Sequence, residues 1–236
     1  MTDRTPLVLL PGFLCDPALW RHQVDTLSDI AEPIVADLTS FDDPVEAVKT
    51  LLPTLPEKFA LAGLSMGGYL AFEFMRQAPE RVTKLALLDT SAREDAPDKK
   101  EQRQGFAEKA LQPDFDIIAT AKHMLGVFIH EGRMTDQPLV DDILAMCERF
   151  GAQAFSRNML LMARRGDSRA GLGKITCPTL VLCGRQDKLI PLEENAEIAE
   201  GIPNATFVIV EDSGHLSTME QPHAVSAVMR YWLNAG

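Results

Sequence analysis

The chain contains 236 residues, of which 46% are hydrophobic and 24% are charged, a balance typical of a soluble globular protein. This length is sufficient for one large domain with a sizeable core, or for one domain with an insertion. The net charge of −11 argues against the clustered basic surface that nucleic-acid binding requires and disfavours anionic membranes. We therefore expect no nucleic-acid partner and no membrane partner.

The N-terminal apolar run, Leu7–Leu10, is far too short for an export signal or a transmembrane span. The four cysteines, Cys15, Cys147, Cys177 and Cys183, lack metal-ligand spacing, and in the cytoplasm they are expected to be free thiols. We therefore predict a cytoplasmic protein with no metal and no other cofactor.

Short apolar runs alternate with helical patterns along most of the chain. Strands are expected at Leu7–Leu10, Pro33–Ala36, Phe59–Leu64, Lys84–Leu88, Thr179–Cys183 and Thr206–Val210. Helices are expected at Pro17–Leu27, Pro44–Leu52, Gly67–Gln77, Leu192–Ala199 and Pro222–Leu233. Such alternation predicts an α/β fold with a doubly wound, mostly parallel six-stranded sheet that helices cover on both faces.

The alternation stops between residues 92 and 174, where the sequence has no convincing strand. Helices are expected there at Lys99–Leu111, Phe115–Val127, Pro138–Phe150 and Ala152–Arg164. Because connections in compact domains are short, a helical segment of this length indicates an insertion. We predict a core domain of residues 1–91 and 175–236. Residues 92–174 would form an all-helical cap at the carboxyl ends of the strands, where open α/β sheets bind ligands.

The pentapeptide Gly63-Leu64-Ser65-Met66-Gly67 lies between an expected buried strand and an expected buried helix. A serine on such a sharp turn forms a nucleophile elbow. Gly63 and Gly67 are small, as the close approach of strand and helix requires. The pattern alone arises often by chance, and it is this strand–turn–helix context that predicts Ser65 as a catalytic nucleophile.

A serine nucleophile needs a base, and a third group must orient that base. Asp187 and His215 lie in the loops that follow the last two expected strands. The other histidines lie within or beside expected helices, so His215 is the predicted base. Asp187 is the predicted acid, because its loop and that of His215 follow neighbouring strands. Asp89 also follows a strand and is the alternative acid.

Ester hydrolysis passes through a tetrahedral intermediate, which requires two hydrogen-bond donors aimed at its oxygen. The backbone N–H of Met66, at the start of the helix after the elbow, is one expected donor. The loop after the first strand must border Ser65 if the strands pair as expected. Gly12 permits a tight turn in that loop, and the backbone N–H of Phe13 is the second expected donor.

In order and spacing, these motifs resemble the α/β-hydrolase superfamily, in the branch of small bacterial carboxylesterases with a helical cap. The matching segments are Leu9–Phe13, Gly63–Gly68, Pro79–Val82, Pro178–Gly184, Asp187 with Pro191, Gly214–His215 and Glu220–Pro222. The resemblance covers nearly the whole sequence outside the cap. It implies Ser65 as nucleophile, Asp187 as acid, His215 as base, and Phe13 and Met66 as oxyanion donors.

Two features depart from the superfamily pattern. Many relatives carry His-Gly where this chain has Pro11-Gly12, so any role of that histidine in shaping the oxyanion loop is absent. The antiparallel hairpin that opens the larger members is also missing, so the sheet is expected to have six strands rather than eight.

The predicted function is that of a serine hydrolase. It would cleave a carboxylic ester of small or medium acyl chain through an acyl-enzyme intermediate. The substrate pocket is expected to include Leu14, Met124, Phe128, Met159 and Leu216, with flexible methionines suited to an acyl chain. Since one triad serves many reactions on this fold, an enol-lactone hydrolase or a carbon–carbon bond hydrolase is an alternative. A binding protein with negligible turnover is another.

The cap region carries a local excess of arginine: Arg149, Arg157, Arg164, Arg165 and Arg169. These side chains either form a solvated helix face or receive a substrate carboxylate or an acidic carrier protein. The second interpretation fits a methyl ester hydrolase of carrier-bound acyl chains, a class that the chain also resembles. The expected assembly is a monomer or a homodimer.

Overall fold

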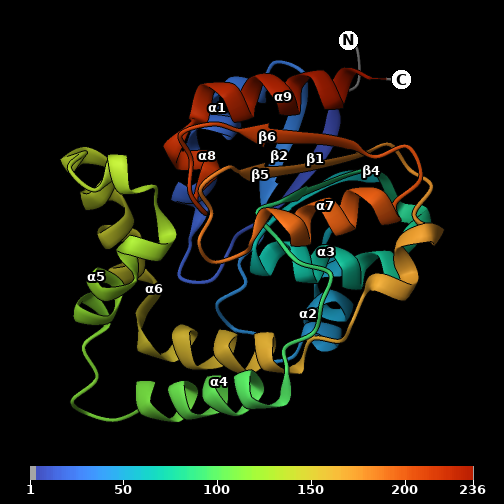
Figure 1. The fold of residues 1–236 in the computed structure, drawn as a ribbon. Helices are drawn as coiled ribbons and strands as arrows, with labels where there is room; N and C mark the ends of the chain where they lie inside the picture. Colours follow the sequence, from blue (N-terminus) through green and yellow to red (C-terminus); the bar gives the residue numbers. More distant parts are fainter. Residues whose placement is uncertain (1–3, 236) are drawn as a thin grey trace.

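The computed structural model describes residues 4–235 and is built around one six-stranded sheet (Figure 1). The strands are β1 (Thr5–Leu10), β2 (Ala31–Val35), β3 (Phe59–Leu64), β4 (Val82–Leu88), β5 (Thr179–Gly184) and β6 (Thr206–Val210). Their order is β2-β1-β3-β4-β5-β6, and every neighbouring pair is parallel. The predicted doubly wound, six-stranded sheet is confirmed.

Parallel pairing brings the carboxyl ends of the strands to one edge of the sheet. Leu10 at the end of β1 is paired with Gly63, and Leu64 at the end of β3 is paired with Leu88. The strands β3 and β5 are buried along their whole length, as expected of strands covered on both faces. The loops that follow β1, β3, β4, β5 and β6 therefore meet at this edge.

Two layers of helices cover the sheet (Figure 1). On one face α1 (Arg21–Leu27) packs against α9 (Pro222–Asn234). On the other face lie α2 (Pro44–Leu51), α3 (Met66–Gln77) and α7 (Leu192–Gly201). These five helices match the expected ones within a few residues.

Some short elements were not expected. Residues Pro17–Trp20, predicted as the first turn of the α-helix that became α1, instead form a 3₁₀ turn capped by the Asp16 carboxylate. A one-turn helix, α8 (Ser217–Glu220), precedes α9. Further 3₁₀ turns lie at Leu52–Thr54, Pro79–Arg81, Glu131–Arg133 and Arg169–Lys174.

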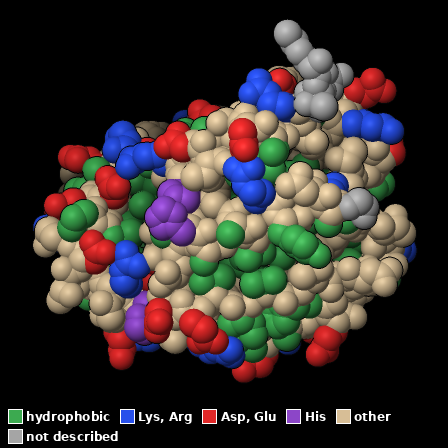
Figure 2. All heavy atoms as spheres, turned by 90° about the horizontal axis from the view of Figure 1, so that it is seen from above, with side chains coloured by type: hydrophobic (Ala, Val, Ile, Leu, Met, Phe, Trp, Pro, Cys, Tyr) green, Lys and Arg blue, Asp and Glu red, His purple; other side chains and the backbone are tan. Residues whose placement is uncertain are grey.

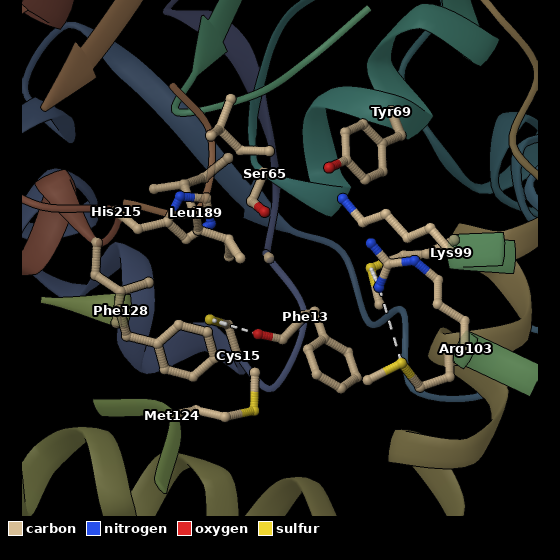
Figure 3. Close-up of a pocket in the computed structure, with 16 residues that line it drawn as sticks. Phe13, Cys15, Ser65, Tyr69, Lys99, Arg103, Met124, Phe128, Leu189 and His215 are labelled. Carbon is tan, nitrogen blue, oxygen red and sulfur yellow. Dashed lines mark hydrogen bonds between the residues drawn. The ribbon is translucent and has the colours of Figure 1, made fainter. Parts of the chain in front are cut away.

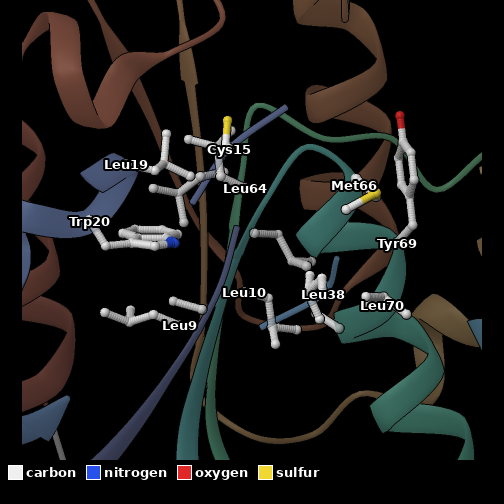
Figure 4. Packing of buried hydrophobic residues seen from close by; sticks show 14 of the residues in the cluster. Leu9, Leu10, Cys15, Leu19, Trp20, Leu38, Leu64, Met66, Tyr69 and Leu70 are labelled. Atoms are coloured by element: carbon white, nitrogen blue, oxygen red, sulfur yellow. The ribbon is translucent and has the colours of Figure 1, made fainter. Parts of the chain in front are cut away.

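The core uses both faces of the central strands (Figure 4). In β1, Leu9 points toward Trp20 on the α1 side, and its neighbour Leu10 points toward Leu70 on the α3 side. All four side chains are fully buried. Burying a leucine contributes about 2 kcal/mol, so packing on both faces fixes the sheet and, with it, the loops at its edge.

The segment between β4 and β5 is helical, as expected. It contains α4 (Pro97–Ala110), α5 (Ile117–Phe128) and α6 (Gln137–Arg164), and Figure 1 shows these helices beyond the edge of the sheet. Gly151, with φ +75°, interrupts α6 at the point where two separate helices were predicted. The cap boundaries at residues 92 and 174 stay a prediction.

No helix within residues 4–235 is both long enough and apolar enough to cross a membrane. Figure 2 views the molecule from the side of α9, where acidic and basic side chains are scattered around a hydrophobic area. This face therefore carries no gathered basic surface.

Candidate active site

Ser65 lies on the sharp turn between β3 and α3, with φ +55° and ψ −114°. Left-handed φ is uncommon for a residue other than glycine. The turn is tight because the elements around it nearly touch. A Cβ atom at Gly63 would lie 2.3 Å from the Gly67 carbonyl oxygen, and a Cβ atom at Gly67 would lie 2.1 Å from that of Leu10. The small residues that the sequence places two positions on either side of Ser65 are therefore required by the packing.

Hydrogen bonds hold the elbow in place. The Ser65 N–H donates to the Leu88 carbonyl at 2.9 Å, which continues the β3–β4 pairing into the turn. The Ser65 carbonyl accepts from the Thr90 hydroxyl at 2.7 Å and from the Gly68 N–H at 2.9 Å. Neighbouring structure thus determines the strained conformation of Ser65.

His215 and Asp187 form a buried pair in the loops after β6 and β5. Their side chains meet at 2.7 Å, between His215 Nδ1 and Asp187 Oδ2. The second carboxylate oxygen of Asp187 accepts the backbone N–H groups of Leu189 at 2.8 Å and Ile190 at 3.0 Å. Nδ1 therefore carries the proton and donates it in a hydrogen bond to the Asp187 carboxylate, which leaves Nε2 as the basic nitrogen.

Glu220 fixes the loop that carries His215, a role the sequence did not indicate. Its carboxylate accepts the backbone N–H groups of Gly214, at 3.0 Å, and Leu216, at 3.2 Å, and its other oxygen accepts that of His130. The His215 N–H donates to the Phe128 carbonyl at the end of α5, at 3.0 Å. The loop is thus joined to the helical segment that closes the site.

The electrostatics around His215 favour its protonated form. Burial alone lowers the pKa of the imidazole, but the charge and hydrogen bond of Asp187 act in the opposite direction, with smaller contributions from Asp89 and Glu220. The net result is a His215 pKa above its ordinary value. This environment also stabilises the imidazolium that forms when the ring accepts a proton.

Asp89, the alternative acid, makes a different set of contacts. Its carboxylate accepts the Gly184 N–H at 2.8 Å and the Ser217 hydroxyl. Burial, followed by the nearby Asp187 charge, raises the Asp89 pKa well above its usual range. The imidazole hydrogen bond is made by Asp187, and Asp89 connects the ends of β4 and β5 to α8.

The two expected oxyanion donors lie in adjoining loops, because β1 and β3 are neighbours. The Cys15 N–H bonds to the Gly12 carbonyl at 3.2 Å, so the β1 loop turns tightly at Phe13. Within the described residues, the backbone N–H groups of Phe13 and Met66 have no hydrogen-bond acceptor. Both are thus free to donate to a bound substrate.

A cavity lies over Ser65 and His215 (Figure 3). Four of the five side chains expected in the pocket line it: Met124, Phe128, Met159 and Leu216. The fifth, Leu14, has a φ of +61°, is fully buried and is not among the residues that line the cavity.

The sequence missed a polar part of the cavity wall. Tyr69 of α3 and Lys99 and Arg103 of α4 line the cavity together with Ser65. Tyr69 was identified only as part of a helix. Lys99 and Arg103 lie on a helix that is polar on almost every side, so no hydrophobic pattern in the sequence indicates which face meets the site. Their spacing of four residues, one helical turn, is the only signal that they share a face.

None of the five arginines singled out in the sequence lines the cavity. Each contacts another part of the chain: Arg149 pairs with Asp16, Arg157 donates to the Thr39 carbonyl, Arg164 pairs with Asp42, Arg165 pairs with Asp95 and Arg169 pairs with Asp167. Arg149, Arg157 and Arg164 thus connect α6 to the loops after β1 and β2, whereas Arg165 and Arg169 pair with Asp95 and Asp167 of the segment between β4 and β5.

Within residues 4–235, no group of three or more histidine, cysteine, aspartate or glutamate side chains is arranged to hold a metal ion. Ser65 and His215 thus line one cavity, His215 is paired with Asp187, and the free N–H groups of Phe13 and Met66 lie in the adjoining loops.

Residues 32–222 match the family model of the alpha/beta hydrolase fold. The chain belongs to this family. A solved thermophilic esterase from Thermogutta terrifontis, with malate bound, is 34% identical and superimposes with a TM-score of 0.89, over 97% of this chain and 89% of that one. The predicted resemblance to the esterase-like members of the superfamily is confirmed.

Two curated relatives carry more specific names. A pimeloyl-[acyl-carrier protein] methyl ester esterase from Legionella pneumophila (strain Paris) is 28% identical, over 89% of this chain and 87% of that protein. A 2-hydroxy-6-oxononadienedioate/2-hydroxy-6-oxononatrienedioate hydrolase from Paraburkholderia xenovorans (strain LB400) is 29% identical, over 80% of this chain and 67% of that protein. The substrates in these two names differ, so membership of the family does not identify the substrate of this chain.

Proposed function

We propose that the protein is a serine hydrolase that cleaves carboxylic esters of small or medium acyl chain. The observation that carries this proposal is the placement of Ser65, on a strained elbow, in one cavity with the buried His215–Asp187 pair. Strained backbone persists only where the surrounding structure determines it, and it concentrates at active sites.

In the proposed reaction, Ser65 Oγ attacks the ester carbonyl while His215 Nε2 takes the proton of the Ser65 hydroxyl. The N–H groups of Phe13 and Met66 bind the oxyanion of the tetrahedral intermediate. The C–O bond to the alcohol then breaks, the alcohol leaves with the proton held by His215, and Ser65 remains acylated. A water molecule, deprotonated by His215, attacks the acyl-enzyme and releases the acid.

The cavity wall suits an apolar acyl chain. Met124, Phe128, Met159 and Met162 of the helical segment line it. Methionine side chains adapt to flexible apolar ligands. The named esterases among the relatives support ester cleavage as the activity, and a methyl ester on a carrier-bound acyl chain is a second candidate, favoured by the name of the Legionella pneumophila relative. Cytoplasmic location and a monomeric or homodimeric state stay predictions from the sequence.

A panel of p-nitrophenyl esters graded by acyl length tests the proposal, with enol-lactones and carbon–carbon bond substrates assayed in parallel. We expect the highest kcat/KM for a short or medium ester. Ser65→Ala is expected to lower kcat by at least a thousandfold, roughly as in other serine hydrolases, while circular dichroism and melting temperature stay unchanged. A variant that keeps more than about a tenth of the wild-type kcat would rule out Ser65 as the nucleophile.

A further inference from the structure

One end of the active-site cavity is positively charged. Lys99 and Arg103, one turn apart on α4, reach the cavity beside Tyr69 of α3, and His215 lies on the other side of Ser65 (Figure 3). We name these three side chains the Lys99–Arg103–Tyr69 cluster. The triad described above does not use them.

The charges around this cluster do not cancel. Asp95 is buried and lies within ion-pair distance of Lys99 at 3.4 Å, of Arg165 at 2.8 Å and of Arg103. Burial opposes its ionisation, but Arg103 and Arg165 lower the Asp95 pKa overall, so it carries one negative charge against three positive charges. Besides Asp95, Glu194 is a carboxylate whose charge raises the Tyr69 pKa, and Glu194 does not line the cavity. Among the residues that line the cavity, Lys99 and Arg103 carry positive charges and none is a carboxylate.

Arg103 Nε donates to the Asp95 carboxylate, but other donors of the cluster have only weak partners or none. One terminal nitrogen of Arg103 faces the sulfur atoms of Met162 at 3.4 Å and Met159 at 3.8 Å, and thioethers are weak acceptors. The contact from Lys99 to Asp95 is long, and the Lys99 side chain is 47% exposed. Within the described residues, the hydroxyl of Tyr69 has no hydrogen-bond partner, although its ring is buried beneath the Arg165 guanidinium.

The rest of the cavity wall offers few polar groups to an anion. Apart from Ser65 and His215, the remaining lining side chains are apolar or cysteine, and glycine completes the wall. A substrate with one anionic group thus has one favourable place for it, within the same cavity as the nucleophile. Guanidinium, ammonium and phenol donors together suit a carboxylate, which offers two oxygens.

We propose that the Lys99–Arg103–Tyr69 cluster binds a carboxylate of the substrate. The enzyme then prefers esters that carry a second, ionised carboxyl group over neutral esters of the same size. This inference rests on the proposed function, since it assigns the substrate class of that same cavity.

The test compares matched pairs of esters. Monomethyl glutarate against methyl pentanoate places the carboxylate on the acyl side, and O-acetyl lactate against O-acetyl lactamide places it on the alcohol side. We expect the wild-type protein to favour the anionic member of at least one pair by about tenfold or more in kcat/KM, as a charged hydrogen bond provides. The pair that responds identifies the side of the ester bond that carries the carboxylate.

Two substitutions probe the cluster, and one serves as a control. Lys99→Gln and Tyr69→Phe should each lower the anionic-to-neutral ratio of kcat/KM, by about tenfold for Lys99→Gln. Lys100→Gln changes the next residue on α4, which pairs with Glu94 and does not line the cavity, so it should leave this ratio unchanged. Wild-type ratios of about one in both pairs, or equal shifts in Lys99→Gln and Lys100→Gln, would overturn the inference.

A binding measurement separates this inference from the proposed function. We expect glutarate to bind Ser65→Ala in titration calorimetry, and to bind the Lys99→Gln, Ser65→Ala double variant about tenfold more weakly. Glutarate binding without turnover of any ester would contradict the proposed function alone. Turnover of neutral esters without glutarate binding or anionic preference would contradict the carboxylate site alone.

Discussion

Among single residues, Ser65 has an unfavourable backbone conformation, and this conformation places its side chain at the edge of the sheet. Its φ of +55° costs about 1–3 kcal/mol, and hydrogen bonds from Thr90 and to Leu88 hold it there. A side chain in this conformation is presented at the edge of the sheet, away from the core. Four of the residues in and around the site were predictable because each follows a strand at this edge: Ser65, Asp89, Asp187 and His215.

The two candidate acids are distinguished by their hydrogen bonds. We predict that Asp187→Asn lowers kcat by about ten-thousandfold, as loss of the orienting carboxylate does in the serine triad. Asp89→Asn should lower kcat far less, because Asp89 binds Gly184 and Ser217 and not the imidazole. Steady-state kinetics on one ester, with melting temperatures as the folding control, measure both. The opposite ranking would transfer the acid role to Asp89.

The pH dependence reports the environment of His215. Its neutral form is the base, and Asp187 holds its pKa above the ordinary 6.5 in spite of burial. We therefore predict that kcat/KM rises with pH through a midpoint above 6.5. Because the folded pKa is raised, the contribution of this group to stability is greatest below the unfolded pKa and is lost as pH rises through the folded pKa. A kinetic midpoint at or below the ordinary histidine value would contradict this description of the site.

At the scale of elements, the helices beyond the sheet edge form one side of the cavity. α4 provides Lys99 and Arg103, α5 provides Met124 and Phe128, and α6 provides methionines. Their existence was predictable from helical patterns, and the break at Gly151 from the glycine itself. The sequence did not predict which side chains of these helices enter the cavity, because that depends on how the helices pack against one another.

The arginines of α6 allow a test at this scale. Arg157 and Arg164 contact the loop around Asp42, and half-exposed pairs of this kind contribute about 1 kcal/mol or less. We predict that Arg157→Glu with Arg164→Glu changes kcat/KM for a neutral short ester by less than about threefold. A methyl ester on a carrier-bound acyl chain should respond equally little. Selective loss of the carrier-bound substrate would instead identify these arginines as a docking surface for an acidic carrier.

At the scale of the whole molecule, a parallel sheet gathers residues from distant parts of the sequence. The alternation of strands and helices predicted the sheet and the common edge at which Ser65, Asp187 and His215 meet. It did not predict that the Leu14 side chain is fully buried, at a residue with a left-handed φ, or that the Glu220 carboxylate fixes a neighbouring loop. Both depend on tertiary contacts that local patterns do not contain.

In the proposed mechanism, Ser65 becomes covalently acylated. The most direct measurement is the intact mass of the protein after reaction with a fluorophosphonate, followed by peptide mapping. We predict one phosphonyl group per chain on Ser65 and none on Ser65→Ala, with Ser91, also buried, as an internal comparison that stays unlabelled. A label on another residue, or equal labelling of Ser65→Ala, would contradict Ser65 as the nucleophile.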